Sequence, residues 1–336
     1  MKRRFRGLAI AAGNVYTGVL LGFVLLQRTA VGGVWPMRLV ANFLPYLFLP
    51  LLLLVPLVII SKSRLAKLVI CLPCAVFLLL YGQLFFPQLG SVSSGSERML
   101  TVMTYNVTRG DPGAEQILSI IQSEDADIVA LQEVSPELAE ALVRLDDRYP
   151  YRALHPTPDG YAGSAVLSRY PLSGDAVFPL VEGAHLFQRV AIDVRGTEIQ
   201  LLNVHLQPPR VPVRRGGSRI LIPSGYDTST QDRELERLFQ EMEKLSGPMI
   251  VVGDFNMTDQ SPGYRELTGE LEDAYREAGW GFGHTFPDVE VRSIATPLPV
   301  VRIDYVFHSH DLAARRAYVG DRGGPNHRFL VAELSL

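Results

Sequence analysis

Acidic residues are missing from the first quarter of this 336-residue chain. Residues 1–86 contain no aspartate or glutamate but hold nine lysines and arginines, whereas the rest of the chain has 23 basic and 35 acidic residues, a net charge of −12. A basic, apolar part joined to an acidic, polar part indicates that the two parts sit in different solvents. The net charge of the whole chain, −3, hides this division.

Cysteine is almost absent. Cys71 and Cys74 are the only two, and they lie in an apolar run as Cys-Leu-Pro-Cys. In water such a pair binds metal or cycles between thiol and disulfide, but inside an apolar run without further ligands we interpret it as two small buried residues. Residues 87–336 contain no cysteine, which excludes disulfides from that part of the chain.

Charge is also missing from the interior of three long apolar runs, at about 8–26, 39–60 and 65–86. Each run has about 20 residues, enough for a helix to cross the hydrocarbon core of a bilayer, and prolines are tolerated inside such helices. We therefore predict a membrane anchor of three transmembrane helices in residues 1–86. The alternative for the first run is a cleaved signal peptide, because residues 1–6 are basic.

The distribution of basic residues predicts an orientation for this anchor. Four basic residues lie in the N-terminal tail, and after Lys67 none occurs until Arg98. Because basic loops favour the cytoplasmic side, we expect the N-terminus in the cytoplasm and residues 99–336 outside the cell. The protein is therefore expected to be a multi-pass protein of the cell membrane with an extracytoplasmic domain.

Residues 87–98 are rich in glycine and serine and read as a linker. Residues 99–336 mix apolar strand-like runs with amphipathic helices, which predicts layered α/β structure. The expected strands are 99–107, 127–131, 165–168, 188–194, 199–205, 249–252, 303–307 and 329–334, and the expected helices are 113–123, 136–145, 230–245 and 264–270.

One segment, residues 208–229, fits no helix or strand. Proline, glycine and serine are in excess there, and arginines alternate with valine, isoleucine and leucine. A long loop inside a compact domain is usually functional or disordered, so it is a candidate substrate loop, with a solvated surface insertion as the alternative. Its basic residues are Arg210, Arg214, Arg215 and Arg219.

Polar residues recur where apolar strands end. Because the ends of strands at one rim of a sheet are where rigid scaffold meets solvent, sites are built there. A single such residue is more simply a loop group satisfying the backbone, but a set of this chemistry indicates a site. The set is Asn106, Glu133, Asn203, His205, Asp254, Asn256, Asp304 and His327.

This set is rich in carboxylates and amides. Oxygen ligands of this kind suit Mg²⁺ or Mn²⁺ rather than zinc. An Asp-His pair supports general base chemistry, with the aspartate fixing the imidazole tautomer. No serine lies in a Gly-x-Ser-x-Gly elbow. The chemistry that fits best is attack of water on phosphorus, assisted by a bound cation.

These motifs, in this order, resemble the endonuclease/exonuclease/phosphatase superfamily, the deoxyribonuclease I-like fold, from about residue 99 to 336. The resemblance implies a four-layer α/β/β/α sandwich of two packed sheets, preceded here by the three transmembrane helices. The motifs that carry it are Thr-Tyr-Asn106, Leu-Gln-Glu133, Asn203-Val-His205, Gly-Asp254-Phe-Asn256, Arg-Ile-Asp304-Tyr and Asn326-His327.

The resemblance also implies roles for these residues. Glu133 would bind the metal, helped by Asn106. Asp254 and Asn256 would position water and the phosphoryl oxygens. His205 and His327 would flank the phosphate, and Asp304 would hold His327. His284, outside these motifs, is expected to have a structural role.

Two positions depart from the family pattern. Asn326 stands where the family usually has aspartate before the histidine, and Thr108 stands where some members carry another aspartate. Fewer carboxylates weaken a second metal site, so we predict one dominant metal centred on Glu133. Asn326, Thr108 and Asn203 are then candidates for a second metal site or for support of the first.

The sequence leaves three functions open. The first is hydrolysis of a membrane lipid phosphoester or pyrophosphate, favoured by the short tether to the bilayer and by the basic-apolar loop beside His205. The second is a membrane-tethered nuclease acting on DNA or RNA, which the acidic body disfavours. The third is a non-catalytic binding module, suggested by Asn326 and Thr108. No protein partner can be inferred.

Overall fold

The computed structural model describes residues 2–61, 63–86, 99–110, 113–216, 220–287, 290–291, 294–295, 300–320 and 326–336. The chain divides into two compact units, which are described separately. The helical unit comprises residues 1–86 and 210–227, and the sheet unit comprises residues 87–209 and 228–336. The expected linker, residues 87–98, lies outside the described residues.

The helical unit is built from apolar helices and one small hairpin. Tyr16 donates a hydrogen bond to the carbonyl of Leu47 (2.9 Å), and Phe48 packs edge-on against Phe77, so segments far apart in the sequence pack together. The elements are α1 (Lys2–Leu26), η1 (Ala30–Gly33), α2 (Trp35–Ala41), η2 (Leu44–Phe48), α3 (Leu51–Ile60), α4 (Arg64–Tyr81), η3 (Gly82–Leu84), β8 (Val213–Gly216) and β9 (Ile220–Pro223).

One helical stretch among the described residues is long and apolar enough to cross a membrane. Arg64–Leu84 has 21 residues and a mean hydropathy of 2.2. The expected span 39–60 is broken: Trp35–Ala41 and Leu44–Ile60 pass the same test only as a pair bent by 75°. Pro45 and Pro50 lie at the starts of η2 and α3. Because proline has no backbone N–H, it interrupts the hydrogen bonds that would continue the preceding helix. The apolar part of α1, Ile10–Leu26, is shorter, so the described helices amount to one or two candidate spans by length and composition, not three.

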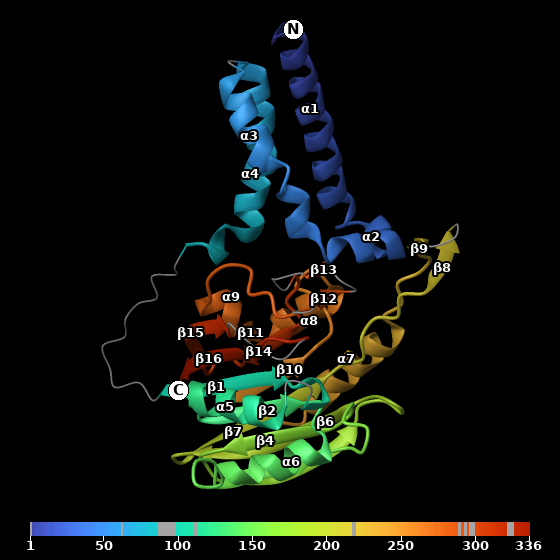
Figure 1. Cartoon of the computed structure of the whole chain (residues 1–336). Coiled ribbons are helices and arrows are strands. Elements are labelled where there is room, and N and C mark those ends of the chain that lie inside the picture. The colour runs from blue at the N-terminus through green and yellow to red at the C-terminus, as the bar shows by residue number, and fades with distance from the viewer. Residues whose placement is uncertain are drawn as a thin grey trace. The chain divides into compact units, whose positions relative to one another are not determined.

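The sheet unit contains two six-stranded sheets (Figure 1). Sheet 1 has the order β15-β16-β1-β2-β4-β3, and sheet 2 has the order β11-β14-β10-β7-β6-β5. Sheet 1 consists of β1 (Met99–Asn106), β2 (Ile128–Gln132), β3 (Tyr151–His155), β4 (Ser164–Ser168), β15 (Ala313–Val319) and β16 (Leu330–Ser335). Sheet 2 consists of β5 (Leu172–Pro179), β6 (Leu186–Val194), β7 (Thr197–His205), β10 (Met249–Asp254), β11 (Glu272–Asp273) and β14 (Asp304–His308).

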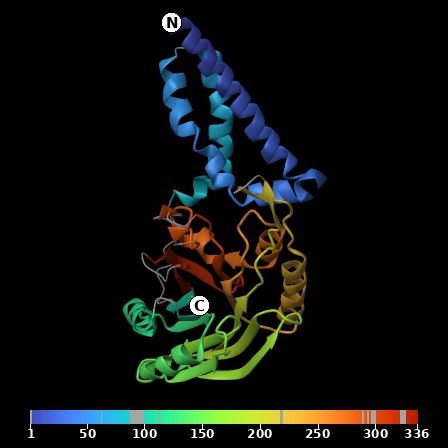
Figure 2. The same ribbon diagram turned by 45° about the vertical axis from the view of Figure 1, so that its right-hand side comes forward.

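Helices cover the outer faces of the sheets (Figure 2). Alternation along β2 shows how the layers form: Ile128 and Ala130 point into the core between the sheets, while Val129 and Leu131 pack under α5 and α6. A third apolar cluster joins sheet 2 to α7 and α8 through residues such as Leu235 and Leu267. The remaining elements are α5 (Ala114–Glu124), α6 (Pro136–Leu142), α7 (Ser229–Met242), α8 (Pro262–Glu270), α9 (Ala274–Ala278), η4 (Thr108–Gly110), η5 (Val143–Leu145), β12 (Glu290–Val291) and β13 (Ile294–Ala295).

This arrangement confirms the expected α/β fold with two packed sheets, both of them mixed. Each sheet has one parallel pair, β1 with β2 and β7 with β10, and its other strand pairs are antiparallel. The two strands of a parallel pair end at the same edge of their sheet. The sheets therefore each bring two strand ends, and the loops that follow them, to one place.

Candidate functional site

The ends of the two parallel pairs meet. Asn106 ends β1 and Glu133 follows β2, while His205 ends β7 and Asp254 ends β10. The amide nitrogen of Asn106 donates to Asp254 Oδ2 at 2.9 Å and to Glu133 Oε1 at 3.1 Å. One amide therefore joins a carboxylate from each sheet.

Asn106 is itself fixed by the backbone. Its Oδ1 accepts a hydrogen bond from the N–H of Thr108 (3.0 Å), so its amide nitrogen, not its oxygen, faces the carboxylates. The expectation was an oxygen ligand for the metal, and this would require the amide to turn over. Thr108, a candidate supporting residue, thus touches the site through its backbone, while its buried hydroxyl has no hydrogen-bond partner among the described residues.

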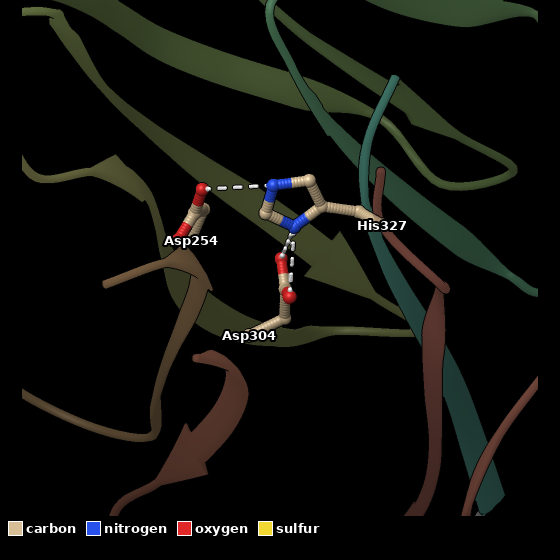
Figure 3. Close-up of side chains that lie close together, drawn as sticks. All are labelled: Asp254, Asp304 and His327. Carbon is tan, nitrogen blue, oxygen red and sulfur yellow. Dashed lines mark hydrogen bonds and ion pairs between the residues drawn. The ribbon is translucent and has the colours of Figure 1, made fainter. Parts of the chain in front are cut away.

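Asp304, His327 and Asp254 form a second group (Figure 3). Nδ1 of His327 lies 3.1 and 3.3 Å from the two oxygens of Asp304, and its Nε2 lies 3.7 Å from Asp254 Oδ2. Asp304 begins β14 and His327 lies three residues before the start of β16, so this group too uses one strand from each sheet. With Asp304 on Nδ1, the tautomer that presents Nε2 to the site is favoured.

The segment around Thr285 positions both members of this pair. Thr285 Oγ1 accepts hydrogen bonds from the N–H groups of Ile303 (3.2 Å) and Asp304 (3.3 Å), and the Thr285 carbonyl accepts from Arg328 N (2.9 Å). The ring of Phe286 lies 4.7 Å from that of His327. Thr285 and Phe286 therefore help to hold Asp304 and His327 in place.

Backbone geometry explains why glycine and asparagine occur in the Gly-Asp-Phe-Asn motif. Gly253 has φ +138°, and a Cβ there would lie 1.8 Å from the carbonyl oxygen of Val204, so only glycine fits. Asn256 donates its backbone N–H to Asp254 Oδ1 (2.8 Å) and its amide nitrogen to the Leu206 carbonyl (2.8 Å). Asn256, which has φ +49°, thus holds Asp254 in place.

His205 faces both carboxylates. Its Nε2 lies 3.6 Å from Asp254 Oδ2 and 3.9 Å from Glu133 Oε1. Its Nδ1 is buried without a hydrogen-bond partner among the described residues. The ring instead stacks on His185, with centroids 3.7 Å apart and planes at 17°. A histidine in such a site is usually oriented by a hydrogen bond to its second nitrogen, and here the stack takes that place.

Asn203 lies beneath this cluster in a polar network that crosses the sandwich. Its Oδ1 accepts from Gln132 (2.7 Å), and its amide nitrogen donates to the carbonyls of Leu131 (3.0 Å) and Ala165 (3.3 Å). Gln132 also donates to Thr104 (3.1 Å). The amide oxygen and the amide nitrogen of Asn203 both make hydrogen bonds that join the sheets, so Asn203 has a supporting position.

Burial of so many polar groups shifts their pKa values. Burial raises the pKa of Glu133, partly offset by the hydrogen bond from Asn106, and raises that of Asp254 to about 7. Burial alone would lower the pKa of His327, but the carboxylates of Asp304 and Asp254 raise it to about 9. Burial lowers the pKa of His205 well below its ordinary value. At neutral pH His327 is therefore cationic and His205 is neutral.

The residues present fit a divalent cation. Ligand atoms of Asp254, Asp304 and His327 lie within 4.8 Å of one another, and Glu133 approaches the same Asp254 through Asn106. Three buried carboxyl groups lie around one imidazolium, and burial raises the pKa of Glu133 and Asp254, so a bound cation would stabilise their ionised forms. Oxygen-rich donors of this type suit a hard cation such as Mg²⁺.

Not every candidate belongs to this cluster. The segment 210–227 belongs to the helical unit, so Arg210 and Arg214 are not among the residues brought together. The side chain of Arg215 and all of Arg219 lie outside the described residues. Asn326 is partly exposed beside His327.

Two contributors were not predicted from sequence. His185 lies in the loop before β6, where no strand-end pattern marks it, and only the fold shows the stack. Thr285 directly follows His284, for which the sequence predicted a structural role. The Gly-His-Thr-Phe-Pro run was the sequence signal that could have indicated Thr285.

Comparisons with known proteins identify the family and the fold. Residues 103–330 match the profile of the Endonuclease/Exonuclease/phosphatase family. A comparison with curated proteins finds no significant match.

Several solved structures share the fold. The endonuclease/exonuclease/phosphatase from Beutenbergia cavernae superposes with a TM-score of 0.54 at 24% identity, over 71% of this chain and 72% of that one. The mannosyl-6-phosphatase of Bacteroides thetaiotaomicron gives 0.52 at 20% identity, over 70% and 100%. D. rerio TDP2, solved with a single-stranded DNA product, gives 0.56 at 13% identity, over 71% and 100%. At these identities the likeness concerns the fold alone.

Proposed function

This chain belongs to the endonuclease/exonuclease/phosphatase family, whose members are generally hydrolases of phosphate esters, and from that premise we propose that it is a metal-dependent phosphoesterase acting on a membrane lipid phosphoester or pyrophosphate. The observation that carries the chemistry is the Asp304–His327–Asp254 group beside Glu133, with every member buried. Such a constellation of perturbed carboxylates and an oriented imidazole is what hydrolysis at phosphorus needs.

In the proposed mechanism, Glu133 would hold Mg²⁺ or Mn²⁺, which when bound would supply positive charge to the phosphoryl oxygens. The amide of Asn106 keeps the carboxylates of Glu133 and Asp254 at the spacing seen here. One dominant cation is proposed, because Asn326 and Thr108 bring no carboxylate.

The pKa values indicate which side chain donates a proton and which accepts one. Because the pKa of His327 is about 9, its Nε2–H is a proton donor at neutral pH and is suited to a phosphoryl oxygen. Asp254, with a pKa of about 7, is suited to accept a proton from the attacking water. Asn256 keeps Asp254 in position. His205, neutral and facing the same carboxylates, flanks the phosphate from the other sheet.

The lipid substrate is proposed from the tether. Twelve residues separate Phe86 from Met99, and even a fully extended chain of that length spans only about 40 Å, so the sheet unit works within that distance of the bilayer if the helical unit is inserted. Tethering raises the effective concentration of a membrane substrate. The bias of basic residues toward the N-terminal tail supports a cytoplasmic N-terminus, and an odd number of spans would then put the sheet unit outside the cell.

A nuclease is the second candidate. It is favoured by the shared fold with TDP2, whose structure holds single-stranded DNA, and disfavoured by the −12 charge of residues 87–336. A binding module without catalysis is the third.

One set of assays separates the three. The full chain in nanodiscs is incubated with Mg²⁺ and either bis-p-nitrophenyl phosphate, plasmid DNA or lipid phosphates, with Glu133→Ala and His327→Ala as controls. The proposal expects lipid phosphate release that both substitutions lower by ~10²-fold or more. Cleavage of DNA alone would sink the lipid substrate, and binding of metal without turnover of any substrate would favour the third candidate.

A further inference from the structure

Residues 210–227, called here the arginine hairpin, belong to the helical unit although both ends of the segment lead into the sheet unit. β8 and β9 pair antiparallel, with Arg214 opposite Ile222 and Val213 opposite Pro223. The base is closed by two backbone hydrogen bonds of 2.9 Å between Arg210 and Asp227. The hairpin is therefore a closed structural element that is connected to the sheet unit at both ends but belongs to the helical unit.

A polar contact ties the hairpin to α2. Asn42, which follows α2, donates its amide N–H to the hydroxyl of Tyr226 at 3.1 Å and to the carbonyl of Arg38 at 3.1 Å. Figures 1 and 2 both show β8 and β9 beside α2. Asn42 thus links the end of a helix to the hairpin across 184 positions of sequence.

The hairpin leaves several apolar side chains about half exposed. Val213 is 53% exposed, Ile222 41% and Val211 40%. Val34 and Trp35, at the start of α2, are exposed in the same unit. A two-stranded hairpin is at best marginally stable in water, and exposed aliphatic residues on such an element indicate a surface that covers them.

The charge of the hairpin indicates which kind of surface covers these side chains. Residues 210–226 contain four arginines and no acid, and the same unit contains a helix apolar enough to cross a bilayer. Aliphatic side chains interleaved with arginine are typical of elements in the headgroup layer, where each basic residue adds about 1 kcal/mol of attraction to anionic lipid. A nucleic acid would meet the arginines but leave Val213 and Ile222 uncovered.

We propose that the arginine hairpin and α2 lie together in the anionic headgroup layer of the bilayer that holds the helical unit. The hairpin is then a second membrane attachment of the chain, beginning five positions after His205 and ending just before α7. The inference rests on the membrane anchoring in the proposed function but not on catalysis.

The test places a fluorophore on the hairpin of the full chain. Cys71 and Cys74 are replaced by alanine, and a single cysteine is introduced by Val213→Cys or Ile222→Cys and labelled with an environment-sensitive NBD dye. The matched control is Glu140→Cys, an exposed position on α6 of the sheet unit. The labelled protein is reconstituted in phosphatidylcholine vesicles with or without phosphatidylglycerol, containing lipids spin-labelled near the headgroup.

In vesicles with phosphatidylglycerol, the dye at 213 and 222 is expected to shift to the blue and to be quenched by the spin-labelled lipid, while the dye at 140 does neither. Arg214→Gln or omission of phosphatidylglycerol should reduce the quenching. Tyr226→Phe, which removes only the hydroxyl that meets Asn42, should reduce it too.

Two results would overturn the proposal. Dyes at 213 and 222 that behave like the dye at 140, in protein that floats with the vesicles, would show a hairpin in water. A blue shift without quenching by lipid would place a protein surface over it. Failure of the chain to float with vesicles would overturn the membrane anchoring as well, whereas loss of phosphoesterase activity alone would leave this proposal standing.

Discussion

The charge on His327 is favoured by the carboxylates of Asp304, Asp254 and Glu133, of which Asp304 is in direct hydrogen-bond contact. Asp304→Asn removes a charge that raises the pKa of His327, so the imidazole loses its proton at lower pH. If His327 donates a proton to the phosphoryl group, the alkaline limb of the pH–rate profile moves down by at least about 1 unit, and kcat falls by ~10²- to 10⁴-fold.

The measurement is kcat against pH on bis-p-nitrophenyl phosphate, for the natural chain and the variant. A variant whose alkaline limb stays in place would show that His327 is not the group reported by that limb. Asp311→Asn, on an exposed loop residue, serves as the control.

His185 offers a separate test of how His205 is oriented. His185→Ala removes the ring stacked on His205 and should lower kcat by roughly tenfold, since a misplaced group near the reacting atoms costs that order or more. His185→Phe keeps a flat ring of similar size and should restore most of the activity, with KM little changed in both variants.

Equal losses for the two variants would mean that a nitrogen of His185 is needed, and unchanged activity in His185→Ala would remove the role altogether. Thermal unfolding of both proteins checks that the fold is retained.

At the scale of residues, sequence alone predicted the set that the fold brings together, because most members end or follow an apolar strand and the ends of parallel strands share an edge. Asp304 and His327 instead lie at or before the start of β14 and β16, which run antiparallel to β10 and β1 and so begin at that same edge. Asn106, Glu133, His205, Asp254 and His327 all lie within this cluster. The direction of the Asn106 amide was not predictable, since it is decided by the backbone N–H of Thr108. His185 was missed because a loop histidine carries no periodic signal.

The helix α7 contains a buried acid outside the site. Glu234 is 1% exposed, accepts a hydrogen bond from Gln207 N (2.8 Å), and burial raises its pKa to about 7. The unfolded chain releases this proton near the ordinary glutamate value, so the native state binds more protons between that pH and 7. The stabilisation that protonated Glu234 gives the folded state is therefore fully present below about pH 4, and it is lost as the pH rises through about 7.

Glu234→Gln keeps an acceptor for Gln207 and removes the titration. The variant should lose less stability than the natural chain between pH 5 and pH 7, by on the order of 1 to 3 kcal/mol. Urea unfolding at a series of pH values checks this, and parallel curves for the two proteins would contradict it.

The start of β14 is held by a buried ion pair. Arg302 makes two hydrogen bonds to Asp273, of 2.7 and 2.9 Å, and both side chains are nearly inaccessible. Arg302→Met leaves a buried carboxylate unpaired and should lower the free energy of unfolding by about 3 to 5 kcal/mol. Arg316→Met breaks an exposed pair with Glu333 and should cost less than about 1 kcal/mol. Denaturant unfolding compares the two, and similar losses would contradict the assignment.

At the scale of elements, the central strands were predictable and the edges were not. The unpredicted strands β3, β5 and β15 are the outermost strands of their sheets, and β11 is an edge strand of two residues. An edge strand packs less of its surface, so its alternation is weak: β5 has no fully buried residue. The apolar run 39–60 predicted one helix, but apolar composition does not report the breaks at Pro45 and Pro50.

At the scale of the whole molecule, the arginine hairpin should matter only for substrates in a bilayer. Replacing residues 210–227 by a short glycine-serine link is expected to leave hydrolysis of bis-p-nitrophenyl phosphate within about twofold and to lower that of vesicle lipid by ~10-fold or more, because only the second gains from attachment. Rates on both substrates in the same preparation are compared. An equal loss on both would mean that the segment serves the fold of the sheet unit.

The division into two units was partly readable from sequence. The absence of acid in residues 1–86 indicated a separate environment, but membership of residues 210–227 in the helical unit could not be read. That membership depends on contacts such as Asn42 with Tyr226, between positions that no local pattern connects.

The place of β16 in sheet 1 has a consequence for synthesis. β16 lies between β15 and β1, and it pairs along Met99–Thr104 of the first strand made. A ribosome that has produced everything up to Asp304 therefore carries a nascent chain whose β1 has an open edge and whose site still lacks His327. Such an edge is a template for aggregation, and domains emerge from the ribosome from their N-terminal end. The proposed catalytic set is therefore complete only once His327 and β16 have been translated, and a product terminated before them would be a client for chaperones because the edge of β1 stays open.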